Sequence, residues 1–130
     1  MISSTIDLGN SAHRTQVARA CKLIGLCTYE ELVSLTPGGS LYRTDPILHT
    51  RWMIIWLFKM SKLPFLPVSY PEIAKALGVK SHSSVMAAWG KAKNPPGPVA
   101  NTILSRFEAE AWNPQCTQAE ANAAVKEIFG

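Results

Sequence analysis

Residues 69–93, which read SYPEIAKALGVKSHSSVMAAWGKAK, decide the fold of this chain. Ser69 and Glu72 have the spacing of a capping box at the start of a helix, and Gly78 can adopt the left-handed conformation that ends one. Ser81 then places a hydroxyl before a second helical segment, where it can serve as the N-cap. A short helix, a glycine-containing turn and a second helix are typical of a helix-turn-helix. The apolar residues that would hold the two helices at a steep angle are Ile73, Leu77, Val79 and Val85.

Outward from this segment, the apolar spacing is helical along the chain, and alternating strand patterns are scarce. Breakers rich in glycine and proline divide the chain at residues 37–39, 64–67, 94–98 and 113–114. The spacing predicts helices near residues 12–25, 28–35, 46–62, 70–77, 82–93, 99–111 and 117–128. We therefore expect an all-α fold, with residues 1–130 as a single domain, a helix-turn-helix core at 43–93, and flanking helices in 1–42 and 98–130.

The predicted helix at 46–62 is apolar nearly all round, which is typical of a helix at the centre of a core. Trp52 and Trp56 lie one turn apart on it, and core packing is favoured over stacking on a nucleic-acid base. The longest apolar run, Trp52–Phe58, is far shorter than the roughly 20 residues that a membrane-spanning helix needs. Residues 1–10 contain an acid and no basic side chain, unlike a secretory signal. We expect a cytoplasmic protein without a membrane partner.

The composition is that of a folded protein, because 47% of the residues are hydrophobic and only 17% are charged. Cys21, Cys27 and Cys116 cannot all pair within one chain, and no CxxC motif occurs. Buried free thiols and no metal site are therefore expected, as suits a reducing compartment. A thiol site made by Cys21, Cys27 and His13 is the alternative, but the cysteines lie at helical positions in an apolar context, which favours burial.

The charges are unevenly distributed along the chain. Residues 1–42 have no net charge, and residues 98–130 carry a net charge of −2. Residues 43–97 carry eight lysines and arginines against Asp45 and Glu72, for a net charge of +6. A basic middle segment between neutral and acidic flanks is typical of a module that binds a polyanion. The alternative is a solvated basic face that binds nothing.

The basic segment resembles a known DNA-binding domain. The C-terminal domain of the bacterial replication initiator DnaA, which has a Trp-repressor-like fold, begins its signature Ser-Leu-Pro-Glu-Ile-Gly and continues Phe-Gly-Gly-Arg-Asp-His-Thr-Thr-Val. Here the same frame is SYPEIA at 69–74 and LGVKSHSSV at 77–85, without gaps. Upstream, Arg43, Arg51 and Lys59 match the positions of three basic residues of that family. The resemblance covers residues 43–93.

The resemblance implies two sets of contacts to double-stranded DNA. Residues at the start of the recognition helix would reach base edges in the major groove, and Arg43 would enter the adjacent minor groove. The implied base contacts are Arg43, Ser81, His82 and Ser83. The implied phosphate contacts are Arg51, Lys59, Lys80, Ser84, Lys91 and Lys93. Without the family, His82 would be interpreted as a surface or capping histidine, and Ser81 as an N-cap only.

The segment also departs from the family at the positions that read bases. Ser81 replaces an aspartate, and a hydroxyl discriminates less than a carboxylate against bases other than cytosine. Ser83 and Ser84 replace threonines, so the methyl groups that can touch thymine are lost. The connection at 61–69 is longer than in the family and holds two prolines, so it can alter how Lys59 and Lys62 approach the DNA backbone. Preference for the initiator's own box is therefore expected to be modest.

These observations predict a stand-alone, sequence-preferring double-stranded DNA-binding protein related to replication or transcription. No GxxxxGK[ST] motif occurs, so no ATPase, nucleotide or other cofactor is expected. The absence of HExxH and GxSxG motifs argues against an enzyme. Replication proteins are a further candidate partner. The alternative is a protein-interaction module with a decayed DNA-binding surface; RNA binding is a weaker third reading because single-strand stacking motifs are missing.

Overall fold

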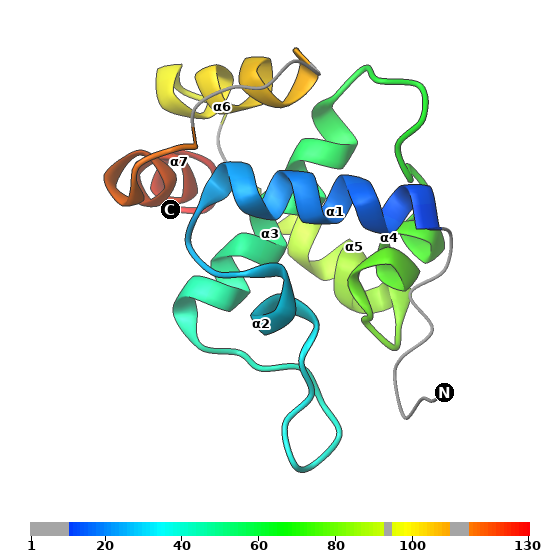
Figure 1. The fold of residues 1–130 in the computed structure, drawn as a ribbon. Helices are drawn as coiled ribbons and strands as arrows, with labels where there is room; N and C mark the ends of the chain where they lie inside the picture. The colour runs from blue at the N-terminus through cyan, green and yellow to red at the C-terminus, as the bar shows by residue number, and fades with distance from the viewer. Residues whose placement is uncertain (1–10, 93–94, 110–114) are drawn as a thin grey trace.

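The computed structural model describes residues 11–92, 95–109 and 115–130 (Figure 1). The described residues form α1 (Ser11–Ile24), α2 (Tyr29–Val33), α3 (Asp45–Met60), α4 (Tyr70–Leu77), α5 (His82–Gly90), α6 (Pro98–Glu108) and α7 (Gln118–Phe129). The expected all-α fold is confirmed, since the only β feature in these ranges is an isolated bridge between Leu35 and Leu41. None of the described helices has the length and apolarity needed to cross a membrane.

Local capping chemistry sets most helix starts. Capping boxes form at Thr28, Ser69 and Thr117, the one at Ser69 as expected, with the hydroxyl accepting from the third helical N–H and the carboxylate of that residue accepting from the cap N–H. Gly78 ends α4 with φ +76°, a left-handed conformation that glycine adopts without steric cost. These signals are local in sequence, so the predicted starts fall within one residue of the observed ones.

The largest differences from the predicted helix lengths are in two helices that end early. The helix expected at 28–35 ends at Val33, because Ser34 is extended and leads into the bridge at Leu35. The helix expected at 82–93 ends at Gly90. The predicted end of the helix at 99–111 lies outside the described residues, as does Lys93.

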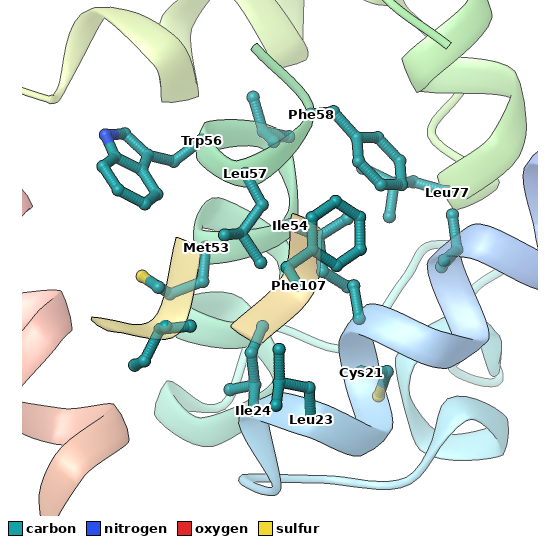
Figure 2. Packing of buried hydrophobic residues seen from close by; sticks show 14 of the residues in the cluster. Cys21, Leu23, Ile24, Met53, Ile54, Trp56, Leu57, Phe58, Leu77 and Phe107 are labelled. Atoms are coloured by element: carbon teal, nitrogen blue, oxygen red, sulfur yellow. The ribbon is translucent and has the colours of Figure 1, made fainter. Parts of the chain in front are cut away.

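Helix α3 runs through the middle of the molecule, and the other helices pack around it. Its residues 53–58 are all buried, which confirms its predicted central place (Figure 2). The ring of Phe58 lies 6.0 Å from that of Phe107 on α6, centroid to centroid. Trp56 is only 2% exposed, as a core interpretation requires. Trp52 is partly buried and lies 5.4 Å from the ring of Phe129 on α7.

The helix-turn-helix forms as predicted in α4 and α5. These helices pack against each other and against α3. Ile73, Leu77 and Val85 are fully buried, and Val79 packs against the same core. The flanking helices complete that core, because Leu32 of α2, Ile103 of α6 and Ile128 of α7 are buried in it as well. The helix pair α6–α7 lies at one side of α3, away from α4 (Figure 1).

Candidate nucleic-acid interface

A hollow of about 380 Å³ lies between the segment before α3, the face of α3 and helix α5. Its polar lining consists of Arg43, Arg51, Ser84 and Lys91, and the remaining lining residues are apolar. No acidic side chain of the described residues lines it. The fold therefore brings together four of the predicted site residues, which are separated by up to 48 positions in the sequence (Arg43 to Lys91). The result is a concave surface of one charge sign beside the second helix of the helix-turn-helix.

Arg51 lies at the base of this hollow and is only 6% exposed. Its Nη2 donates to the carbonyl of Tyr42 at 3.1 Å and, more weakly, to that of Leu32 at 3.5 Å. Its Nε is buried and has no hydrogen-bond partner among the described residues. Burial, and then the charge of Arg43, lower the pKa of Arg51 below its usual range.

This placement corrects the expectation that Arg51 contacts a phosphate at the surface. A guanidinium that is buried and bonded to backbone carbonyls cannot extend to a phosphate on the outside of the molecule. Instead, Arg51 fixes the carbonyl of Tyr42, next to Arg43, and adds positive potential to the hollow from below. Nothing in the sequence distinguishes this buried arginine from an exposed one, because the carbonyls that hold it belong to other segments.

Arg43 is exposed and follows a short projecting loop (Figure 1). The loop is closed by the bridge between Leu35 and Leu41 and by a hydrogen bond from Thr36 N to Ser40 O at 2.7 Å. Gly39 turns the chain with φ +87°. The bridge and this hydrogen bond hold the loop itself, and Arg51 holds the carbonyl of Tyr42, the residue before Arg43. These contacts fix the position of Arg43 beside α5.

The N-terminal end of α5 is open to solvent. Lys80, Ser81, His82, Ser83 and Ser84 are all exposed. The hydroxyl of Ser81 accepts from the Ser83 N–H at 3.1 Å, so Ser81 is the N-cap, as expected. His82 and Ser83 therefore lie in the first turn of the helix, where the positive end of the helix dipole is located. The geometry leaves these side chains accessible from outside.

Lys59 does not belong to the hollow. It lies eight residues beyond Arg51 on α3, which is about 12 Å along the helix axis. Its Nζ donates to the carbonyl of Val68 at 3.1 Å and lies 4.5 Å from the centre of the Tyr70 ring. The long connection at 61–69 thus contacts Lys59 directly. An ammonium has three donors, so Lys59 keeps hydrogen-bonding capacity for an outside acceptor.

The cations around the hollow have no acidic partners. Among the described residues, no carboxylate lies within ion-pair distance of Arg43, Arg51, Lys80 or Lys91. Lys91 lies at the end of α5, where its Nζ is 5.5 Å from the centre of the Trp52 ring. Trp52 is a residue of this surface that sequence reasoning assigned only to the core. The position of Trp52 on α3, directly after Arg51, is the feature of the sequence that could have placed it at this surface.

Comparison of the chain with protein-family models, with curated proteins and with solved structures returned no match. The resemblance to the DnaA domain therefore rests on the residues quoted above.

Proposed function

We propose that this chain binds double-stranded DNA through the hollow, the N-terminal turn of α5 and the loop residue Arg43. The observation that carries the proposal is the set of cations around the hollow without a carboxylate partner in the described residues. Arg43, Lys80 and Lys91 are exposed, so they are available to the phosphate groups of the DNA backbone, which supply the opposite charge.

In the proposed complex, α5 enters the major groove with its N-terminal end first. His82 and Ser83 reach base edges, Ser81 combines a base contact with its cap, and Arg43 reaches into the neighbouring minor groove. Lys80, Ser84 and Lys91 contact phosphates on either side of the groove. Arg51 supports this surface from below, and Lys59 binds the backbone from the far end of α3.

The residue matches to the DnaA domain favour a role in replication or transcription rather than in packaging DNA. The chain has no P-loop motif, so the proposed protein occupies its sites without ATP hydrolysis. Competition with an initiator for shared sites and regulation of a promoter are both compatible with such an activity.

The rival function, a protein-interaction module, drew support from the acidic C-terminal third. The structure reduces that support, because three acids of this region have partners among the described residues. Glu127 accepts from the backbone of α6, Glu120 pairs with Arg106, and Glu108 accepts from the backbone N–H of Lys62. These carboxylates are less available to an outside partner than the cations around the hollow are.

The proposal is tested by titrating the protein with duplex DNA over a range of salt concentrations. About three or four phosphates neutralised predict a log–log slope of roughly −3, so affinity should fall about hundredfold between 50 and 200 mM salt. Lys80→Ala should make the slope shallower by about 1. Lys22→Ala, on the exposed surface of α1, is the matched control and should leave it unchanged. A slope near zero, or equal effects of the two variants, would refute the electrostatic account.

A further inference from the structure

Cys21 and Cys27 are brought together by the turn that joins α1 to α2. Cys21 lies in the last turn of α1, and Gly25 reverses the chain with φ +73°. The thiol of Cys21 donates to the carbonyl oxygen of Cys27 at 3.3 Å. The turn therefore holds one thiol against the backbone of the residue that carries the other. Neither cysteine takes part in the proposed DNA-binding surface.

The two thiols lie in different environments. Cys21 is 1% exposed and belongs to the cluster of buried residues (Figure 2). Cys27 is partly exposed and lines a separate hollow of about 520 Å³, together with Lys22, Tyr29 and Gln115. A small solute can therefore reach Cys27 from solvent, whereas it cannot reach Cys21.

The groups packed around Cys27 favour its ionised form. The neighbouring Cys21 side chain is the main cause that lowers the pKa of Cys27 to about 7, against the opposing effect of burial, and the Thr50 side chain acts in the same direction. The nearby charge of Arg51 acts in the same direction, and that of Glu31 acts against it. The same interaction between the thiols, together with burial, raises the pKa of Cys21. One thiol is thus a nucleophile near neutral pH and the other is a proton-bearing neighbour.

We propose that Cys27 is a peroxide-reactive thiol and that Cys21 is its resolving partner. The Cys27 thiolate attacks one oxygen of hydrogen peroxide, the O–O bond breaks, and Cys27 sulfenic acid and hydroxide form. The Cys21 sulfur then attacks the Cys27 sulfur, and the Cys21 proton leaves with the sulfenic hydroxyl as water. The sulfur atoms lose two electrons in total, which reduce the peroxide. The product is a disulfide that links the end of α1 to the start of α2.

Cys116 provides an internal comparison. It is 3% exposed, and burial raises its pKa, although the Arg106 guanidinium within 3.7 Å of its sulfur opposes that effect. Its backbone N–H donates to the Leu23 carbonyl at 2.9 Å, so it lies near the end of α1 and is a rival partner for Cys27. The geometry favours Cys21, because its thiol donates to the backbone carbonyl of Cys27 itself, whereas the contact of Cys116 is to Leu23.

The first experiment treats the full-length folded protein with stoichiometric hydrogen peroxide at pH 7 and maps the thiols by mass spectrometry. We expect a disulfide between Cys21 and Cys27 and a free Cys116. In Cys21→Ala, oxidation should stop at the sulfenic acid of Cys27, which dimedone captures. Cys116→Ala, the matched control, should form the same disulfide as the unmodified chain. A Cys27–Cys116 disulfide, or oxidation of Cys116 before Cys27, would overturn the proposal.

The second experiment starts with the unmodified protein, so its main outcome does not depend on whether a variant folds. The rate of alkylation of Cys27 by iodoacetamide, followed peptide by peptide, should rise with pH around a midpoint near 7. At pH 7, Cys21→Ala should slow that reaction up to about fivefold, because the loss of thiolate outweighs the gain in nucleophilicity of a thiol with higher pKa. An ordinary thiol midpoint for Cys27 in the unmodified protein contradicts the assignment.

Discussion

The surface around the hollow and the α6–α7 helix pair differ in whether their charged side chains have partners within the chain. In the helix pair, the carboxylate of Glu127 accepts from the N–H groups of Val99 and Ala100, at 3.3 and 2.9 Å, and so caps the start of α6. Arg106 and Glu120 lie 3.4 Å apart. Each of these charges has a partner within the chain. The helix pair thus uses charge to stabilise its own fold.

Around the hollow, no carboxylate of the described residues lies within ion-pair distance of the cations. Arg43, Lys80 and Lys91 are exposed, and Arg51 is buried with a donor that nothing in the described residues accepts from. The net charges of the two regions do not describe this difference fully. The regions differ in whether each charged group has a partner within the chain. Exposed cations without a carboxylate partner remain available to an outside anion, whereas paired charges contribute to the fold. Substitutions in the two regions should therefore affect different measurements.

The largest effect should come from removing a side chain that joins the helix pair to the core. Phe107 is fully buried, packs on Phe58, and has the Arg19 guanidinium 4.2 Å from its ring centre. Phe107→Ala should lower the free energy of unfolding by about 3–5 kcal/mol, measured by urea denaturation. Phe65→Ala, at a site 40% exposed, is the matched control and should change it little. Equal effects would mean that α6 is not part of the core.

That prediction also bears on deletion of the C-terminal helices. Because Ile103 and Phe107 are buried in the shared core, removal of residues 98–130 exposes apolar surface on α1 and α3. DNA binding by the remaining segment is therefore better tested with point substitutions in the whole chain.

Arg43→Ala should change DNA binding and leave the stability of the fold unchanged. We expect a loss of about 1–3 kcal/mol in binding to the preferred duplex, a smaller loss on scrambled duplex, and an unchanged free energy of unfolding. His82→Ala should behave in the same way, since it also removes a proposed base contact. Lys80→Ala should weaken binding to both duplexes about equally. If the three variants act alike on both, the assigned division between base and phosphate contacts is wrong.

Glu127→Ala should destabilise the helix pair without changing DNA affinity. The substitution leaves two N–H groups at the start of α6 without their acceptor, which costs about 1–2 kcal/mol. Glu127→Gln keeps an acceptor oxygen and should recover part of the loss. Thermal unfolding measures both, and duplex titration below the transition should give the affinity of the unmodified chain. A large change in affinity would show that the two regions are coupled.

The sequence predicted those features of the fold that depend on interactions between neighbouring residues. The capping boxes, Gly78 and the apolar residues of α4 and α5 act on neighbours within a few positions, so the helix-turn-helix and its starts were predictable. The partners of Arg51, Lys59 and Glu127 were not predictable, because each is a backbone group brought close by packing between distant segments. The hollow itself has the same origin.

The cysteines show the same limit on a smaller scale. Burial was correctly predicted for Cys21 and Cys116, whereas Cys27 is only partly buried. A spacing of six residues does not reveal that Gly25 folds the chain back so that one thiol reaches the other residue. The left-handed turn determines that juxtaposition, and its direction depends on packing beyond the helix end.

The smallest and most specific effect concerns Ser81, which caps α5 and occupies the position of a base-reading aspartate in the DnaA domain. Ser81→Asp keeps the cap, because aspartate caps helices about as well as serine, and it adds an anion to a helix start that has no acid in its first turn. The free energy of unfolding should therefore stay the same or rise slightly.

In the complex, a carboxylate accepts from the amino group of cytosine and is left unpaired against other bases, which costs more than an unpaired hydroxyl. We expect preference for the initiator's box over scrambled duplex to rise by about 1 kcal/mol, while affinity for scrambled duplex falls because the new charge repels phosphates. Competition between the two DNAs for each variant measures this difference directly. Strong preference for the box in the unmodified chain would show instead that the other residues of α5 and Arg43 are sufficient for discrimination, and that the exchange of aspartate for serine has little consequence at this surface.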